Sequence, residues 1–246
     1  MLSRVRADLH VHTCLSPCGD LQMSPKKIVA QAQRRNIGII AICDHNSTQN
    51  APAVMKAAKA SDVVVLPGME VCSREEIHLL GIFQNPDAAF ALQTMVYDHL
   101  PGKNNPDVFG LQVVANEADE VVEILEKLLI GATDLEVDRI VDEIHRLGGI
   151  AIASHVDRES FSVFSQIGFI PETLGFDALE LTGRTMIDEA RHRFAPVGEA
   201  AFVRNSDAHR LDELGTNTSE YLLECPTLQE IRKALKQEDG RMVFEG

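Results

Sequence analysis

Short apolar runs rich in Val and Ile recur along the chain, separated by segments in which apolar residues repeat every three to four positions. The short runs have the length and composition of strands, and the longer segments have the period of helices. The predicted strands are Arg4–Leu9, Ile37–Ile42, Val63–Leu66, His78–Phe83, Ile150–Ala153, Ala178–Leu181, Phe202–Asn205, Tyr221–Leu223 and Met242–Phe244. This alternation is typical of α/β proteins, and about seven strands of this kind suit a barrel better than an open sheet. Periodicity alone does not decide between the two.

Helix starts are predicted at Ser24, which precedes Pro25, and at Thr133 and Thr227, each followed three residues later by Glu as in a capping box. The segment after Thr133 has apolar residues at helical spacing and ends at Gly148-Gly149. One face of that helix is therefore expected to be buried.

The regular alternation of predicted strands and helices is interrupted between Gln84 and Ala132. A helix-like piece is followed by the polar segment Pro101–Pro106 and then by a second predicted helix rich in Val and Leu. We expect a single domain over residues 1–246 with a helical and loop insertion at about 84–132. Long polar loops in compact domains are commonly functional. The insertion is therefore a candidate substrate-facing lid, and a peripheral excursion without function fits equally well.

The composition is that of a protein with one sizeable core. The 246 residues are 45% hydrophobic and 24% charged, which supports one core and does not demand several domains. No stretch approaches the roughly 20 apolar residues of a membrane span, and the first residues lead into a strand instead of a signal sequence. Five cysteines form no disulfide framework. We expect a cytoplasmic protein with reduced thiols.

The chain carries 23 basic and 37 acidic residues, a formal net charge of −14. Because duplex binding relies on neutralising phosphates with Lys and Arg, this balance disfavours a large nucleic-acid footprint. Bound cations can still make one pocket positive within an acidic protein, so small anionic substrates are compatible with it.

Histidines and acids are placed unusually with respect to the predicted strands. Of the nine histidines, His99, His145 and His192 lie in helical segments. Five of the other six directly follow an apolar run, and His78 lies near the start of its run. The segments that follow runs are Asp8-Leu9-His10-Val11-His12, Asp44-His45, Pro67-Gly68-Met69-Glu70, His155 and Asp207-Ala208-His209.

This placement predicts a metal site. The carboxyl ends of parallel strands converge on one face, so these residues would share a pocket. Several carboxylates in one cleft would repel each other unless a cation lay between them. Mixed imidazole and carboxylate ligands suit Zn, Mn or Fe, whereas Mg and Ca sites do not need so many histidines. We expect two or three such divalent ions.

Together, the ordered motifs resemble the PHP family, which is named for DNA polymerases and histidinol phosphatase. The segments that carry the resemblance are Asp8-Leu9-His10-Val11-His12, Asp44-His45-Asn46, Pro67-Gly68-Met69-Glu70, Ile77-His78-Leu79, Ser154-His155-Val156-Asp157 and Ser206-Asp207-Ala208-His209. The resemblance implies a distorted (β/α)7 barrel, similar to a TIM barrel, with a three-metal site at the carboxyl end of its strands.

The resemblance also implies how the ligands divide. One ion would be held by His10, His12, Glu70 and Asp207, a second by Glu70, His78 and His155, and a third by His45 and His209. Many members have another ligand shortly after the His-x-His pair. We expect Asp20 to take that role here, with Cys18 as its competitor because thiolates bind zinc well. Alternatively, Asp20 only caps a turn.

The expected activity is that of a metal-dependent phosphoesterase. Two ions about 3.5–4 Å apart can hold a bridging water and lower its pKa from about 15.7 to about 7, which supplies hydroxide at neutral pH. Arg158 and Arg184 are candidate phosphate-binding residues, or plain surface arginines. Asp44 is expected to orient a ligand. His209 is expected to act as a proton donor.

The substrate expected from these considerations is a small phosphate ester, such as a nucleotide or sugar phosphate, with no stable nucleic-acid complex and no membrane partner. Three alternatives stay open: a nuclease or proofreading-type phosphodiesterase, a C–N hydrolase, and a metal-binding regulatory module without turnover. The oligomeric state does not follow from the sequence.

Overall fold

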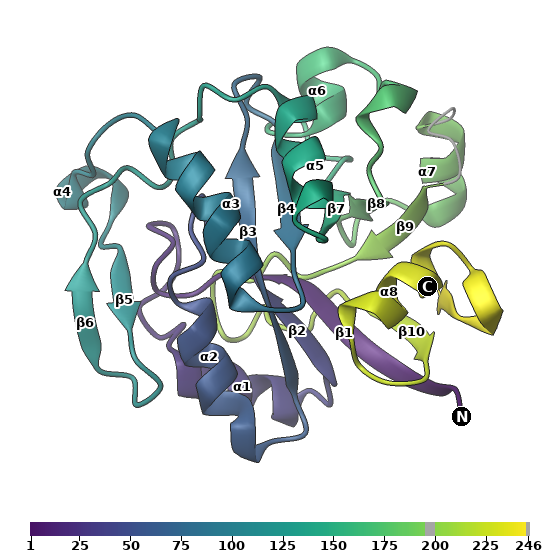
Figure 1. Cartoon of the computed structure of the whole chain (residues 1–246), viewed down its shortest axis with the longest axis horizontal. Coiled ribbons are helices and arrows are strands. Elements are labelled where there is room, and N and C mark those ends of the chain that lie inside the picture. The colour runs from purple at the N-terminus through teal and green to yellow at the C-terminus, as the bar shows by residue number, and fades with distance from the viewer. Residues whose placement is uncertain (195–199, 245–246) are drawn as a thin grey trace.

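Nine strands form one sheet that curls into a nearly closed barrel (Figure 1). The structure is a computed structural model that describes residues 1–194 and 200–244. The strands of the sheet are β1 (Ser3–Val11), β2 (Ile39–Ile42), β3 (Val64–Cys72), β4 (His78–Ile82), β7 (Ile150–Ala153), β8 (Ala178–Leu181), β9 (Ala201–Arg204), β10 (Ser219–Leu223) and β11 (Met242–Phe244). Their order is β11-β10-β1-β2-β3-β4-β7-β8-β9. The predicted distorted barrel is confirmed.

The direction of each strand decides which residues meet. β1, β2 and β3 are parallel to one another, as are β7, β8 and β9. β4 lies between these two groups and is antiparallel to both β3 and β7. The chain beyond β9 closes the barrel against the end of β1, because the amide of His12 donates to the carbonyl of Ala208 (3.0 Å). The carboxyl ends of six strands therefore surround one opening.

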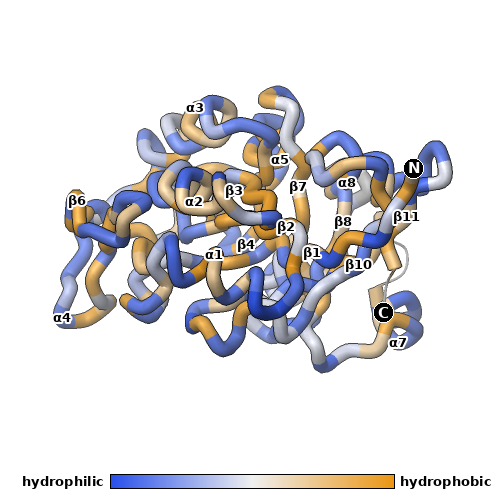
Figure 2. The backbone as a smooth tube through the Cα atoms, turned by 90° about the horizontal axis from the view of Figure 1, so that it is seen from below, coloured by the Kyte–Doolittle hydropathy of each residue, from blue (hydrophilic) through white to orange (hydrophobic). Residues whose placement is uncertain are grey.

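The helices are α1 (Pro25–Arg34), α2 (Ala51–Ala57), α3 (Pro86–Asp98), α4 (Pro106–Phe109), α5 (Val137–Arg146), α6 (Val163–Ile167), α7 (Ile187–Arg193) and α8 (Leu228–Leu235). Most of them lie on the outside of the barrel (Figure 1). The strands that form the barrel wall are predominantly apolar (Figure 2). As predicted, one face of α5 is buried. In the described ranges no helix combines the length and apolar character that crossing a membrane requires.

Two of the three predicted helix starts are confirmed. α1 begins directly after Ser24, and the Thr227 side chain accepts a hydrogen bond from the Glu230 amide at the start of α8. Thr133 is not a cap, because α5 begins at Val137 and the Thr133 hydroxyl instead donates to the carbonyl of Cys72 (2.9 Å).

The segment over residues 84–132 contains α3, α4 and a two-stranded ribbon of β5 (Val113–Ala115) and β6 (Val121–Ile124). The predicted second helix is wrong, since its Val-rich residues form this ribbon. The ribbon packs beside the loop that follows β1, because the Val113 amide donates to the carbonyl of Cys14 (3.0 Å). Leu15 of that loop also joins a small apolar cluster with Leu100, Leu125 and Leu129.

Candidate metal centre

Imidazoles and carboxylates from several strands meet at the carboxyl end of the barrel. His10 and His12 come from the end of β1, Glu70 from β3, and Asp207 from the segment after β9. His10 Nε2 and His12 Nε2 lie 3.1 Å apart, and Asp207 Oδ1 lies 3.3 Å and 3.0 Å from them respectively. Glu70 Oε1 lies 3.3 Å from His10 Nε2. These four residues have the spacing of ligands that surround one ion.

Glu70 connects this group to a second one. Its Oε2 lies 3.0 Å from His45 Nδ1, and its Oε1 lies 3.1 Å from His78 Nδ1 and 3.4 Å from His155 Nε2. The Glu70 carboxylate is buried and faces imidazoles on several sides. His45, Glu70 and His78 form another set with the spacing of metal ligands. A carboxylate placed in this way can bridge two ions.

The reversed direction of β4 explains the position of His78. This residue is the first of its strand. Because β4 runs opposite to β3 and β7, its amino end lies at the same edge as the carboxyl ends of those strands. His78 therefore reaches the cluster from the start of its strand.

His209 completes a third group with His12 and His45. Its ring stacks on that of His12 with the centroids 4.0 Å apart, and its Nδ1 donates to the carbonyl of Asp207 (2.9 Å). That hydrogen bond leaves Nε2 available as a ligand or a proton carrier. The side chain is 24% exposed, so it lies at the open side of the cluster.

The structure distinguishes the two candidates for the extra ligand. The Asp20 side chain is exposed and accepts a hydrogen bond from the Gln22 amide (2.7 Å), which is a turn cap. Burial would raise the pKa of the Cys18 thiol, but interactions with His209 and His45 lower it to about 6. Cys18 is thus the one whose side chain lies beside the histidines. The Asp20 amide donates to the carbonyl of His209 (2.9 Å), but its carboxylate caps the turn.

Glu180 of β8 supports the cluster from behind, although sequence reasoning missed it. Its carboxylate accepts hydrogen bonds from His10 Nδ1 (3.0 Å), from the His155 amide (3.0 Å) and from Asn205 Nδ2 (2.8 Å). Because Nδ1 of His10 donates, Nε2 of the neutral imidazole is left to bind a cation between it, Asp207 and Glu70. A single charged residue inside the apolar strand Ala178–Leu181 was the sequence feature that could have identified it.

Asp44 orients ligands indirectly. The Ser16 hydroxyl donates to Asp44 Oδ1 (2.7 Å) and accepts from His12 Nδ1 (2.9 Å). Asp44 also accepts from the amide and hydroxyl of Thr13. It is fully buried and fixes the loop after β1 together with the tautomer of His12. Asp44 is thus linked to His12 through the Ser16 hydroxyl.

The two arginines predicted to bind phosphate differ in position. Arg158 Nη2 lies 2.7 Å from Asp207 Oδ2, and its side chain is 45% exposed at the mouth of the cluster. Arg184 is exposed after β8, and its amide donates to the Thr182 hydroxyl. Of the two, the structure brings Arg158 to the cluster.

The charges of the cluster are strongly coupled. Burial alone would raise the pKa of the Glu70 carboxyl, but His78, His10 and His45 hold it well below its usual range. Burial would lower the pKa of His10, yet Glu180, Asp207 and Glu70 raise it well above the usual value. Protons therefore balance the buried carboxylates, and a divalent cation can take their place.

The residues fit divalent metal ions. His155 Nδ1 is buried and makes no hydrogen bond. Such buried polar atoms are costly unless a partner satisfies them. The donors are imidazole nitrogens and carboxylate oxygens, the set that Zn, Mn and Fe accept.

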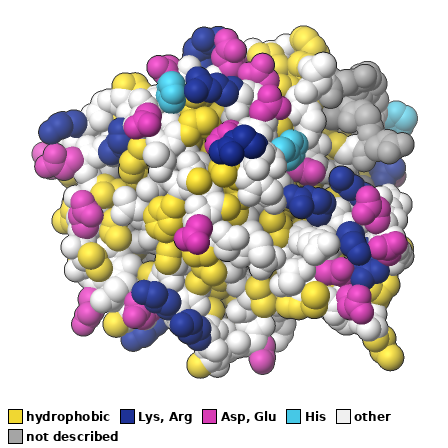
Figure 3. Space-filling view, viewed as in Figure 1, with side chains coloured by type: hydrophobic (Ala, Val, Ile, Leu, Met, Phe, Trp, Pro, Cys, Tyr) yellow, Lys and Arg dark blue, Asp and Glu magenta, His cyan; other side chains and the backbone are white. Residues whose placement is uncertain are grey.

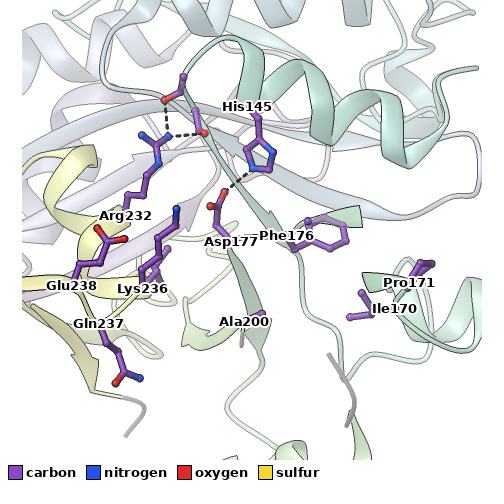
Figure 4. A pocket seen from close by; sticks show the side chains of 14 residues that line it. His145, Ile170, Pro171, Phe176, Asp177, Ala200, Arg232, Lys236, Gln237 and Glu238 are labelled. Atoms are coloured by element: carbon purple, nitrogen blue, oxygen red, sulfur yellow. Dashed lines mark hydrogen bonds and ion pairs between the residues drawn. The ribbon is translucent and has the colours of Figure 1, made fainter. Parts of the chain in front are cut away.

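A cavity elsewhere in the fold lies far from this chemistry. Its wall includes Gly149, Asp177 and Ala200, which directly precede β7, β8 and β9 and so mark the opposite end of the barrel. In Figure 4 His145 faces Asp177, and Arg232 reaches the carbonyls of Gly148 and Gly149. His145 and Asp177 thus pair with each other, and Arg232 is bound to backbone oxygens.

Comparison with known proteins gives a family and a group of nucleases. A family model for the PHP domain matches residues 8–166. Over 80 residues the chain is 32% identical to Rnm, a 5'-3' exoribonuclease of Salmonella typhimurium, which covers 30% of this chain and 26% of that protein. The matches cover between 26% and 53% of the length of the curated relatives compared.

Solved structures share the fold over nearly the whole chain. The lesion-specific endonuclease Q of Pyrococcus furiosus has a TM-score of 0.70 and 18% identity, and the match covers 98% of this chain and 58% of that one. Another endonuclease Q structure, with a TM-score of 0.71, holds a 27-mer duplex substrate with an abasic lesion at the active site. A Bifidobacterium adolescentis protein, proposed to be a metal-dependent phosphoesterase, has a TM-score of 0.57 and 18% identity over 94% of this chain and 96% of its own.

The prediction of a small phosphorylated partner without a nucleic-acid complex is wrong. Endonuclease Q carries a DNA duplex, and Rnm is an exoribonuclease. The error came from the net charge of −14, which is an average over the whole molecule. A cluster of cations can neutralise phosphates locally, whatever the charge elsewhere on the surface.

Proposed function

This chain belongs to the PHP domain family, and we propose that it is a metal-dependent phosphoesterase whose substrate is a phosphodiester bond of a nucleic acid. The observation that carries the proposal is the buried group of histidines and carboxylates at the carboxyl end of the barrel, with Arg158 at its mouth. The nuclease relatives favour a phosphodiester over a small monoester.

We propose that the cluster holds two or three ions of Zn, Mn or Fe. His10, His12, Glu70 and Asp207 would bind one, and Glu70 would bridge to another beside His78 and His155. The third would be held by His45 and His209, beside His12. Ions in such positions supply a water of lowered pKa and neutralise charge on the phosphoryl oxygens.

The chain's own residues would bind the substrate and handle protons. The Arg158 guanidinium is suited to a phosphate oxygen because its planar donors match the geometry of that group. His209 is partly exposed and its Nδ1 is held by the Asp207 carbonyl, so its Nε2 would either bind the third ion or, where that ion is absent, protonate the leaving oxygen. Glu180 and Asp44 would hold the imidazoles of His10 and His12 in the required tautomers.

The surface charge is compatible with a nucleic acid that is bound locally. On the face seen in Figure 3, Lys and Arg side chains lie among Asp and Glu side chains and not in one extended patch. Contacts with a long duplex would gain little from this face. We therefore propose a substrate held mainly at the metal cluster, through the few nucleotides around the scissile bond.

The test is digestion of end-labelled oligonucleotides by wild type and by Asp207→Asn, with Mn²⁺ and with a chelator. We expect wild type with Mn²⁺ to shorten the oligonucleotides. The chelator and the substitution should each reduce the rate by at least about 100-fold, since the chelator removes the ions that neutralise charge in the transition state and the substitution removes one of their ligands. Release of terminal phosphate alone, with intact chains, would contradict the proposal.

A further inference from the structure

The loop between β7 and α6 carries several residues that face the cluster. His155 is the second residue after β7, and Arg158 and Phe161 come three and six residues later. The Ser162 hydroxyl donates to the carbonyl of Arg158 (2.8 Å) and also caps α6. A hydrogen bond within the loop thus fixes its conformation. The loop carries a candidate metal ligand (His155), a cationic side chain (Arg158) and an aromatic ring (Phe161).

Phe161 occupies an unusual position for an aromatic residue. Its φ of 56° lies in the left-handed region, which costs a bulky side chain about 1–2 kcal/mol. The carbonyl of Phe161 accepts a hydrogen bond from the His78 amide (2.9 Å), which anchors this backbone at the edge of the sheet. Strain of this kind is found where the surroundings determine a conformation, and it is frequent at functional sites.

The Phe161 ring lies against a candidate metal ligand and is open on its outer side. It stacks on the His78 ring with the centroids 4.7 Å apart and an interplanar angle of 27°. The residue is nevertheless 42% exposed. Covering His78 would not by itself require an aromatic ring, since an aliphatic side chain can cover an imidazole. An exposed flat ring beside a phosphate-binding centre is a suitable platform for a planar ligand.

Arg158 marks where a phosphate attached to such a planar ligand would bind. Its guanidinium lies 2.7 Å from Asp207 Oδ2 and is 45% exposed, so it faces both the cluster and solvent. Arg158 and Phe161 come from the same loop and approach the cluster beside Asp207 and His78 respectively. A phosphate bound by Arg158 and a base stacked on Phe161 would together make one nucleotide unit.

We propose that Phe161 stacks an unpaired nucleobase next to the scissile phosphate and so selects single-stranded over duplex nucleic acid. This inference rests on the proposed phosphodiesterase function and adds its substrate specificity. A base inside a duplex is stacked on its neighbours, and its face is not available to the ring. Stacking on a protein ring tolerates all four bases, so we expect little sequence preference.

The experiment compares two fluorescein-labelled single strands of equal length, oligothymidylate and an oligomer in which every base is replaced by a tetrahydrofuran abasic residue. Affinities are measured by anisotropy with the full chain loaded with Ca²⁺, and KM and kcat are measured with Mn²⁺. We expect wild type to bind the base-bearing strand about 5- to 100-fold more tightly. In Phe161→Leu that ratio should fall toward one, and Phe161→Tyr should restore it.

The controls separate stacking from a merely structural role. Phe161→Leu keeps an apolar cover over His78, so a structural role predicts an unchanged ratio in that variant. Phe169→Ala removes another exposed ring, 60% exposed after α6, and should behave as wild type. An equal affinity of wild type for both strands, or a ratio that Phe161→Leu preserves, would overturn the inference. Absence of cleavage with intact discrimination in binding would instead count against the phosphodiesterase function.

Discussion

At the scale of single residues, the pattern of strand ends was sufficient to find the histidines and Asp44, but not the supporting residues Ser16 and Glu180. His10, His12, His45, His155 and His209 follow apolar runs, and the fold brings them together. Supporting residues are identified by hydrogen bonds between distant segments, which periodicity does not reveal. Ser16, for example, connects Asp44 to His12 across two loops, and Asp20 proves to cap a turn.

Glu180→Gln tests the support of the cluster. An amide offers only one acceptor, whereas the Glu180 carboxylate receives donors from His10, His155 and Asn205. We expect metal affinity to fall by about 10- to 100-fold, as is typical when the partner of a ligating histidine is changed. Chelator competition measures it. Glu220→Gln, an exposed change on β10, should leave the affinity unchanged, and a wild-type affinity for Glu180→Gln would contradict the assignment.

Asp157 makes a pH-dependent contribution to stability. Burial would raise its pKa, but the Thr182 amide and the hydroxyls of Thr185 and Thr182 lower it below the usual 3.8. A depressed pKa stabilises the fold above the unfolded value, and that contribution is lost as pH falls through the folded value. Asp157→Asn should therefore lower the free energy of unfolding at pH 7 by about 1–2 kcal/mol.

The difference between Asp157→Asn and wild type should shrink as the pH falls below 3.8. Urea titrations at several pH values would show this convergence. A difference that stays constant down to the acid limit would show that the carboxylate charge is not the cause.

At the scale of elements, the strands of the barrel were predictable because each is a short apolar run between polar segments. All nine overlap with predicted strands, and Ile150–Ala153, Ala178–Leu181 and Met242–Phe244 agree at both ends, whereas β3 extends six residues beyond its predicted end at Leu66. The reversal of β4 was not predictable, because strand direction depends on the connection and not on composition. The β5–β6 ribbon was missed because β6 buries neither of its faces. Val121, Val122 and Ile124 are all exposed, so the sequence of this strand shows no alternation of polar and apolar positions.

Gly110 tests the contact between the ribbon segment and the loop after β1. Its φ of 97° and ψ of 173° are accessible essentially only to glycine, and an added Cβ would lie 2.4 Å from the carbonyl oxygen of Pro17. Gly110→Ala should destabilise the protein by about 2–5 kcal/mol and weaken metal binding, since Ser16 lies in the displaced loop.

Gly168→Ala is the matched control for Gly110→Ala. Its φ is also positive, at 80°, but an added Cβ there meets no described atom within 4 Å. It should cost only about 1–2 kcal/mol. Equal losses of stability in urea unfolding, with unaltered metal binding in both variants, would argue against the contact.

At the scale of the whole molecule, the acidic surface and the nucleic-acid substrate are reconciled if binding is local. With a net charge of −14, few phosphates can be neutralised by Lys and Arg. We expect the logarithm of the affinity for a single strand to fall with the logarithm of salt concentration at a slope of about −0.7 to −1.4, which corresponds to one or two phosphates. A slope near −5 would indicate an extended basic interface. Anisotropy titrations between low and high KCl would measure it.

The single domain with an insertion over about 84–132 stays a prediction, as does its role as a lid. What the fold does establish is that this segment packs on the loop carrying Ser16 and Cys18, next to the cluster. Changes in the segment can therefore reach the cluster through that loop.

The central claim is that the barrel gathers its histidines and carboxylates to hold divalent ions. Elemental analysis of wild type and of a His10→Ala, His12→Ala double variant, both purified without added metal, tests it most directly. We predict that wild type retains Zn, Mn or Fe at one or more ions per chain and that the folded double variant retains clearly fewer. Wild type without divalent metal, even after incubation with these ions, or a double variant with the same content, would contradict the claim.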